Sequence, residues 1–164
     1  MKNKFLFFLT ICLFVNINYY NIKAEEFIFE SPVIEITNNG NKVQAKNGVK
    51  VSTKNNIEIT ANESTYDKIK LILSLIGNIK VIDRENNIKI EGENVTYYKN
   101  REEIISKGNT VIRFNNEYVL NTSDVIYSKK ENVILSKNLA TLEDNFGNKF
   151  SAENFTFLVL DKIF

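Results

Sequence analysis

The sequence predicts an all-β protein made of repeated short antiparallel strands, and three observations support that prediction. Apolar and polar residues alternate along segments such as 56–61 and 87–92, which is typical of strands with one buried and one solvated face. Pairs rich in Asn and Gly separate these segments, and both residues tolerate the positive φ of tight turns. The pattern also returns about every 30 residues, which indicates a repeat architecture.

The repeat is visible as columns of similar residues. The first column is apolar, the second small and the third aromatic, at spacings of 30 or 31 residues. The columns are Ile59, Ile90, Leu120 and Phe150; Ala61, Gly92, Thr122 and Ala152; and Tyr66, Tyr97, Tyr127 and Phe157. Gly77 and Gly108 follow two of the tyrosines by eleven residues, and Gly48 belongs to an earlier, partial copy. A unit of this length holds about two to four short strands and cannot bury its apolar face alone, so stacked copies must share one interior.

Six residue pairs mark the expected turns and bends. They are Asn39-Gly40, Asn47-Gly48, Asn55-Asn56, Asn86-Asn87, Asn115-Asn116 and Gly147-Asn148. Residues 69–76 have a composition that also suits a short helix, but the short β-branched stretches at equivalent positions favour a strand. Pro32 suits the edge of the first strand, where a missing N–H is tolerated. A β-solenoid, a two-sheet roll and a closed barrel all satisfy this pattern; a barrel would have no free edges, whereas a stacked roll has an open first and last edge.

The first 24 residues form a separate unit with the pattern of a secretory signal peptide. Lysines precede an apolar run of eleven residues from Phe5 to Val15, and the small residue Ala24 stands just before Glu25. Eleven residues are too few to span a bilayer as a helix, so we favour a cleaved signal peptide over a membrane anchor. The expected organisation is a signal peptide, 1–24, followed by one β domain, 25–164, of an exported protein. The single cysteine, Cys12, leaves with the signal peptide.

Composition excludes several classes of active site. The chain has no histidine and one cysteine, which leaves no Ser-His-Asp triad, no histidine metal site and no disulfide framework. The formal net charge of +1 gives no basic surface for nucleic acid. We therefore expect no catalytic residue, no metal, no cofactor and no nucleic-acid partner. Asp67, Asp83 and Asp144 follow strands, and we interpret them as solvated turn residues rather than as a paired-carboxylate or calcium site.

Part of the repeat resembles a known family. Residues 59–67, Ile-Thr-Ala-Asn-Glu-Ser-Thr-Tyr-Asp, are followed by Leu75-Ile-Gly-Asn-Ile79 and by Ile88-Lys-Ile90. This pattern resembles the OstA-like repeat of the lipopolysaccharide transport proteins LptA and LptC and of the periplasmic N-terminal domain of LptD. The resemblance covers residues 27–160. The opening Phe27-Ile-Phe29, with Ile34-Glu-Ile36 and Asn39-Gly40, is more similar to LptD than to LptA.

The resemblance implies a twisted, V-shaped β-jellyroll with open edges, located in the periplasm. The apolar interior of such a domain shelters the acyl chains of lipid A, and its edges join neighbouring Lpt domains by strand addition. The implied role is the delivery of lipopolysaccharide to the outer membrane, with an outer-membrane barrel as a further partner if the chain is part of an LptD. Passing a lipid requires hidden apolar surface and no reactive side chains.

The candidates for the lipid groove are the residues that alternation places on the inward face. They are Val49, Val51, Ile57, Ile59, Ile79, Val81, Ile88, Ile90, Ile112, Phe114, Leu120 and Phe150. The alternative for each is that it simply fills a core, as the buried face of any sheet does. We interpret the tyrosine column, Tyr66, Tyr97 and Tyr127, as a packing ladder rather than as the rim of the groove.

Two further functions also have to be considered for this sequence. A structural or adhesive extracellular β-solenoid would have a filled interior and would be secreted beyond the outer membrane. A polysaccharide-cleaving β-helix would need recurrent inward acidic residues, which the repeat lacks. The repeat stops at Phe164 in the middle of a unit, so we expect either a longer protein, such as an LptD, or a last strand whose edge awaits a partner.

Overall fold

The computed structural model describes residues 27–159, so the predicted signal peptide, 1–24, lies outside the described residues. All regular structure in this range is β-strand. The fourteen strands are β1 (Ile28–Glu30), β2 (Val33–Thr37), β3 (Lys42–Lys46), β4 (Val49–Ser52), β5 (Ile57–Ala61), β6 (Glu63–Asp67), β7 (Ile72–Asp83), β8 (Ile88–Tyr98), β9 (Glu103–Phe114), β10 (Tyr118–Ser128), β11 (Val133–Ser136), β12 (Ala140–Asp144), β13 (Lys149–Ala152) and β14 (Phe155–Leu158). No helix in the described range is long and apolar enough to cross a membrane.

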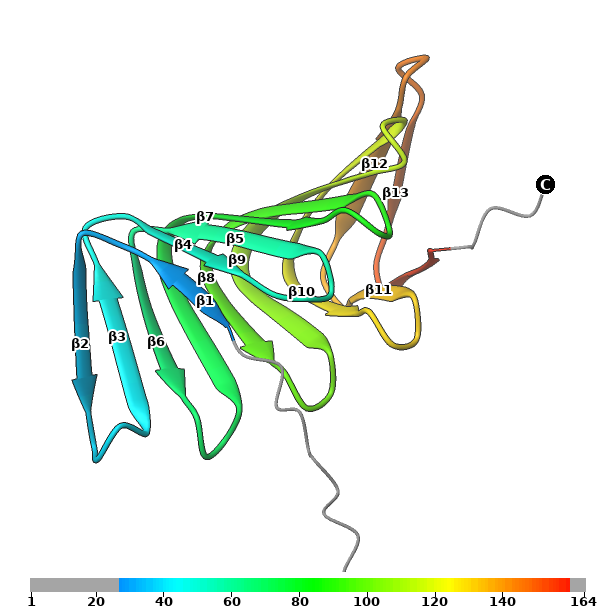
Figure 1. Ribbon diagram of the computed structural model, residues 1–164. Helices are drawn as coiled ribbons and strands as arrows, with labels where there is room; N and C mark the ends of the chain where they lie inside the picture. Colours follow the sequence, from blue (N-terminus) through cyan, green and yellow to red (C-terminus); the bar gives the residue numbers. More distant parts are fainter. Residues whose placement is uncertain (1–26, 160–164) are drawn as a thin grey trace, which may run out of the picture.

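The strands form two layers that meet along a bend, which gives the V-shaped arrangement of Figure 1. The upper layer in that view has the order β1-β4-β5-β7-β8-β9-β10-β12-β13, and the lower layer has the order β2-β3-β6-β7-β8-β9-β10-β11-β14. The four long strands, β7 to β10, contribute one half to each layer. Within the described residues β1, β2, β13 and β14 pair with one neighbour only. The expected all-β jellyroll with open edges is therefore confirmed.

Three of the four long strands change layers at residues with positive φ, and β8 bends without one. β7 bends at Gly77 (φ 76°) and Asn78 (φ 49°), and its register with β8 shifts there. β9 bends at Gly108 (φ 79°), and β10 bends at Asp124 (φ 53°). A positive φ is unfavourable for most residues and readily adopted by glycine, which explains why the repeat places glycine at 77 and 108.

Side chains also hold the bend. The carboxylate of Asp124 accepts hydrogen bonds from the Gly108 N–H (3.0 Å) and from Asn138 Nδ2 (2.9 Å). These donors favour the charged carboxylate and so lower the pKa of Asp124. Asn138 occupies the position that glycine holds in the other copies of the repeat, and here its side chain ties β10 to the chain that follows β11.

Each column of the sequence repeat becomes a row of side chains across one layer. In the upper layer, Ile59, Ile90 and Leu120 lie in one row, and the residues paired between them are Val81 and Ile112. One repeat therefore corresponds to one long hairpin. Its two antiparallel strands each run through both layers, in opposite directions. This explains why a unit of about 30 residues contains two long strands in the middle of the molecule.

The tyrosine column forms the corresponding row of the lower layer. Tyr66, Tyr97 and Tyr127 are buried, and the register continues from Tyr127 through Ile134 to Phe157. Their burial confirms the interpretation of a packing ladder and does not fit a solvated rim.

The six predicted turn pairs all fall between strands, and each contains at least one residue with positive φ. Those residues are Asn39, Gly40, Asn47, Gly48, Asn56, Asn87, Asn115, Asn116 and Gly147. Residues 69–76 begin differently from the prediction, because Asp67 Oδ1 accepts the N–H groups of Ile69 (3.0 Å) and Lys70 (2.9 Å) and so forms a turn. The strand prediction is right from Ile72 onward and wrong for the three residues before it.

Replacing Gly77 with Ala is expected to destabilise the protein more than replacing Gly108 with Ala. Both substitutions force a residue with a Cβ into a positive φ, at a cost of about 1–2 kcal/mol. At position 77 the new Cβ would also lie 2.6 Å from Asn62 Nδ2, whereas at position 108 it would meet nothing within 4 Å. Urea unfolding measures both free energies. Equal losses would show that the space beside residue 77 does not matter.

Candidate functional site

Eleven of the twelve groove candidates lie together on the inner face of the upper layer. They come from β4, β5, β7, β8, β9 and β10 and are at most 4% exposed. They are Val49, Val51, Ile57, Ile59, Ile79, Val81, Ile88, Ile90, Ile112, Phe114 and Leu120. The structure thus places them on the predicted face, in the packed centre of the interior between the two layers.

The twelfth candidate, Phe150, lies on the same inner row but is 61% exposed. The register places it opposite Leu142, which lies opposite Leu120, and directly paired residues share one face of a sheet. β13 is the last strand of the upper layer, and Leu142 beside it is only partly buried. The inward apolar row therefore continues past the point where the lower layer covers it.

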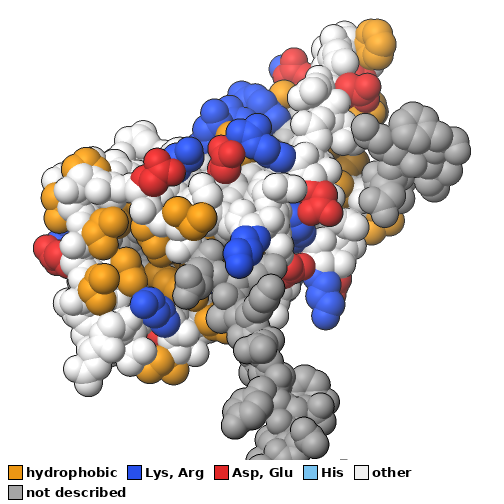
Figure 2. All heavy atoms as spheres, viewed as in Figure 1, with side chains coloured by type: hydrophobic (Ala, Val, Ile, Leu, Met, Phe, Trp, Pro, Cys, Tyr) orange, Lys and Arg blue, Asp and Glu red, His pale blue; other side chains and the backbone are white. Residues whose placement is uncertain are grey.

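The interior is uncovered at the opposite end as well. Ile34 and Ile36, on the end strand β2, are 44% and 62% exposed. They are paired with Ala45 and Val43, which are buried, so they belong to the inner face of the lower layer. Figure 2 shows hydrophobic side chains gathered at this end of the molecule. Sequence analysis did not select these residues, because the first repeat is a partial copy and offers no column on which to align them.

Aromatic rings flank both open ends of the interior. Phe27 packs edge to face against Tyr66, with ring centroids 4.7 Å apart. At the other end Phe157 lies 4.3 Å from Phe114, and Phe155 stacks parallel to Phe157 at 6.3 Å. An apolar ligand that reaches either end would therefore contact aromatic side chains.

A polar cluster closes the interior on the side opposite the bend, and sequence analysis missed it. On this side, which we call the turn side, the turns at 53–56 and 84–87 of the upper layer face the turns at 99–102 and 129–132 of the lower layer. The side chain of Asp83 is 0% exposed, so the interpretation of a solvated turn residue is wrong for Asp83. Asp67 and Asp144 do cap their turns as expected.

Asp83 serves two purposes at once. Its Oδ1 accepts the N–H groups of Glu85 (3.0 Å) and Asn86 (3.2 Å), which is the turn role that the sequence suggested. Its Oδ2 accepts hydrogen bonds from the hydroxyl of Tyr127 (2.8 Å) and from Asn86 Nδ2 (3.1 Å). Tyr127 belongs to the lower layer, so this carboxylate joins the layers.

Lys129 makes a second connection between the layers. Its side chain is only 9% exposed, and its Nζ donates to Asn55 O (2.9 Å), Glu85 Oε2 (2.8 Å) and Asp83 Oδ1 (3.3 Å). Nearby, Asn55 Nδ2 donates to Glu102 Oε1 (3.1 Å). We call this set of residues the clasp. It comprises Asn55, Asp83, Glu85, Asn86, Glu102, Tyr127 and Lys129.

The clasp changes the acidity of its members. Burial and the neighbouring charge of Asp83 raise the pKa of Tyr127, so its hydroxyl remains a neutral donor. Burial alone would lower the pKa of Lys129, but the hydrogen bond with Glu85 and the charge of Asp83 outweigh it and raise that pKa. The lysine is therefore charged while its side chain is almost fully covered.

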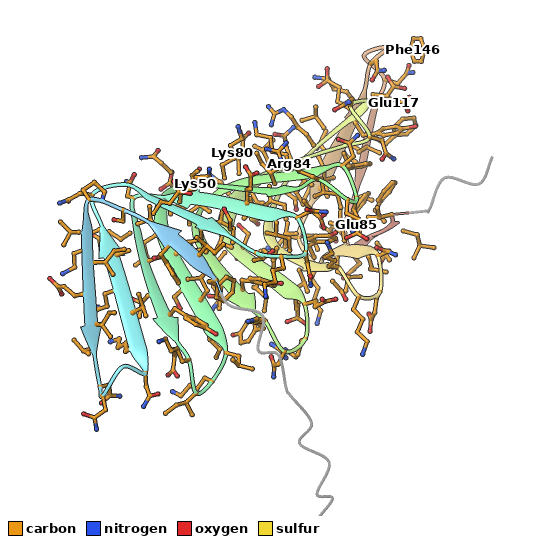
Figure 3. All side chains as sticks on the ribbon, in the orientation of Figure 1. Lys50, Lys80, Arg84, Glu85, Glu117 and Phe146 are labelled. Atoms are coloured by element: carbon orange, nitrogen blue, oxygen red, sulfur yellow. The ribbon has the colours of Figure 1, made fainter. Side chains whose placement is uncertain are left out.

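The outer face of the upper layer carries exposed charges, and basic side chains gather there in Figure 2. Arg84 pairs with Glu58 (3.0 Å) and Arg113 pairs with Glu91 (2.7 Å). Exposed pairs of this kind contribute little to stability. Figure 3 shows Arg84 and Glu85 leaving the same turn in different directions, Arg84 over the outer face and Glu85 toward the lower layer.

No metal centre is found within residues 27–159, where no group of three or more His, Cys, Asp or Glu side chains could hold an ion. A cavity of about 590 Å³ lies beside β10, β11 and β14, and Ile126 and Leu135 contribute to its lining. These two residues alternate with the buried Tyr127 and Ile134 and so face outward. Ser136 and Phe155 also line it, and they pair with each other on the inner face, so the cavity is lined by residues from both faces of the lower layer.

Comparison with known proteins agrees with the fold. No known family profile matches this sequence, and no curated protein matches it. The structure is similar to the crystal structure of LptH, the LptA homologous periplasmic component of the lipopolysaccharide transport device from Pseudomonas aeruginosa. The TM-score is 0.60 at 12% sequence identity, over 67% of this chain and 80% of LptH. This chain therefore has the fold of an LptA-like β-jellyroll.

The Tyr127→Phe substitution is expected to lower the free energy of unfolding by about 1.5–3 kcal/mol, because it removes a hydrogen bond to a buried carboxylate. Tyr118→Phe is the matched control, since the Tyr118 hydroxyl makes no hydrogen bond to the described residues. Its effect should stay within about 0.5 kcal/mol. Urea denaturation measures both, and equal effects would contradict the role given to the Tyr127 hydroxyl.

The contribution of Lys129 to stability is expected to disappear only at high pH. Because its pKa is raised on folding, the stabilisation is complete below the pKa of free lysine, about 10.4, and is lost as the pH rises through the folded value. The stability difference between wild type and Lys129→Met should therefore be constant at neutral pH and shrink above about pH 10.4. Lys130→Met, at an exposed neighbour, is the control for the loss of one surface charge. A Lys129→Met difference that is unchanged across that range would contradict the assignment.

Proposed function

We propose that this protein is a periplasmic module of lipopolysaccharide transport, which shelters the acyl chains of lipid A between its layers and passes the lipid toward the outer membrane. One observation carries the proposal: the apolar inner face runs the length of the molecule and is uncovered at both ends, at Ile36 and at Phe150. The likeness in fold to the periplasmic protein LptH supports the same role. Export by the predicted signal peptide is consistent with it.

Apolar burial alone can hold such a ligand. Each CH₂ group removed from water contributes about 0.8 kcal/mol, so an acyl chain needs an apolar wall and no reactive group. The packed centre leaves little room for a chain, whereas the two ends already present uncovered inner-face side chains. We infer that a chain enters at an end and then displaces contacts between the layers. The proposal assigns no enzymatic activity to the protein.

The open edges suggest how neighbouring domains connect. β1 and β2 end the two layers on one side, and β13 and β14 end them on the other. A strand of another Lpt domain added to such an edge would gain backbone hydrogen bonds. It would also cover Ile36 or Phe150 and join the two apolar interiors into one path. Within this group of proteins we favour an LptD N-terminal domain or an LptA-like protein, and an LptD would add an outer-membrane barrel as a partner.

A second candidate function, a structural or adhesive extracellular β-solenoid, is favoured by the filled centre of the interior. The uncovered inner face at both ends favours transport instead, because a solenoid with a purely structural role gains nothing from exposing it. Cell fractionation separates the two. A transport module stays in the periplasm, and an adhesive protein appears outside the outer membrane.

A photo-crosslinking amino acid at Phe150 or at Ile36 is expected to capture lipopolysaccharide in growing cells, because both positions lie on the uncovered inner face. The matched controls are Ser151 and Glu35, which neighbour Phe150 and Ile36 on the same strands and face the opposite way. They should capture no lipid.

Two results would contradict the proposal. Crosslinks from all four positions to protein alone would indicate a scaffold without lipid. Equal lipid capture from the inward and outward positions would indicate contact with a membrane surface rather than with the interior.

A further inference from the structure

The clasp bridges the two layers at one place along the turn side. Lys129 and Tyr127 of the lower layer reach Asp83, Glu85 and the backbone of the turn at 53–56 in the upper layer. Asn55 and Glu102 add a hydrogen bond between the facing turns. On this side of the molecule the interior is therefore shut by polar contacts and not by apolar packing alone.

The clasp stands between the two open ends of the interior. It is formed by turns next to β5, β7, β8, β9 and β10, which occupy the middle of both layers. Ile36 lies at one end of the apolar face and Phe150 at the other. Ile88 pairs with Asp83 of the clasp, and Phe114 pairs with Ile88; both apolar residues are buried. A ligand that moves through the interior from end to end must pass this point.

A lipid cannot pass the clasp while it stays closed. The acyl chains of a lipid belong in the apolar interior, but its polar headgroup must remain in water, because burying polar groups without partners is costly. The bend closes the other side of the V with continuous backbone. The headgroup must therefore project from the turn side, where the Lys129 and Asn55 contacts cross its path.

The clasp is also built so that it can open. Its hydrogen-bonding groups lie at the surface end of the interior, and Glu85 is already 61% exposed. When the clasp opens, water replaces the hydrogen-bond acceptors of Lys129. Asp83 Oδ1 keeps the hydrogen bonds that it accepts from the N–H groups of its own turn. Polar contacts of this kind exchange with water at a modest net cost, whereas separating packed apolar side chains exposes surface that water does not satisfy.

We propose that the clasp is a gate on the turn side, and that Lys129, Asp83 and Tyr127 are positioning residues that control lateral access to the apolar interior. This inference rests on the proposed function for its ligand, a lipid with a polar headgroup. Opening of the gate itself is a property of the free protein and can be measured without any lipid.

The test locks the gate covalently. In a Cys12→Ser background, Asn55→Cys and Glu102→Cys place two thiols on facing turns, and a short reducible bifunctional reagent couples them across the turn side. The matched control couples Lys70→Cys and Arg101→Cys, which lie on neighbouring turns of the lower layer and do not span the gate. Fluorescently labelled lipopolysaccharide is the probe, and its association rate is measured by stopped flow.

We expect the locked protein to take up lipopolysaccharide at least tenfold more slowly than the same protein before coupling, and reduction of the linker to restore the rate. The control pair should change the rate less than twofold. Equal rates for locked and unlocked protein would overturn the gate. Failure of the unlocked protein and of wild type to bind any lipopolysaccharide would instead overturn the proposed function.

A second readout tests the gate without lipid. A third thiol, introduced by Ile88→Cys at the residue paired with Asp83, is labelled by a soluble maleimide after the coupled pair has consumed its own thiols. The unlocked reference and the Tyr127→Phe protein carry Ile88→Cys without the thiols at 55 and 102, so that only residue 88 is labelled. We expect labelling to be at least fivefold slower in the locked protein than in this reference, and faster when Tyr127→Phe weakens the clasp. Labelling that is equally fast in locked, unlocked and Tyr127→Phe proteins would show that the clasp is a static contact. That result would overturn the inference whatever the lipid experiment gives.

Discussion

The arrangement of this protein depends on one constraint: an apolar sheet face is hidden only where a second layer covers it. The bent strands β7 to β10 supply both layers from the same chain, so their inward residues cover one another and the centre is packed. The end strands lack that mutual cover. Ile36 on β2 and Phe150 on β13 lie on inner faces and yet are mostly exposed. Openness at the ends is thus a consequence of how the layers are built and does not require a separate binding site.

The bends and the turns have different roles in this arrangement: the bends let one strand belong to both layers, and the turns connect the layers where they separate. At the bends, positive φ at Gly77 and Gly108 lets one strand leave a layer and join the other without ending. On the turn side the layers separate again, and polar side chains connect them. The Asp83 carboxylate accepts a hydrogen bond from the turn that follows it. Tyr127 and Lys129, which belong to the opposite layer, donate to the same carboxylate. A polar connection is one that water can replace, which distinguishes it from the apolar packing behind it.

The sequence predicted most of the fold because its repeat is local and regular. The alternation around Ile59 and Ile90 assigned inward residues correctly, since a strand has only two faces. The Asn and Gly pairs located the turns because few residues adopt a positive φ. The exposure of Phe150 could not be predicted, because its column matches Ile59 and Ile90 in residue type and differs only in lying on a last strand.

The clasp could not be predicted from the sequence either, for a different reason. Tyr127 and Lys129 contact Asp83 across 44 and 46 residues, through two layers whose separation is set by the bend. No local pattern encodes that distance. An aspartate at the end of a strand is usually a solvated turn residue, and Asp83 keeps the hydrogen bonds of such a residue while its side chain is buried.

In the proposed function, acyl chains contact the inner face at its uncovered ends. Solution NMR of the purified protein with lipid A can detect this contact through intermolecular NOEs from acyl methylene protons. We expect NOEs to the methyl groups of Ile36 and the ring of Phe150. We expect none to Ile28, which lies on an outer face, or to Phe146, which lies at the tip of the β12–β13 hairpin (Figure 3), although Ile28 is about as exposed as Ile36 and Phe146 is more exposed. NOEs to Ile28 and Phe146 as strong as those to Ile36 and Phe150, or no NOEs to Ile36 and Phe150, would contradict the proposed function.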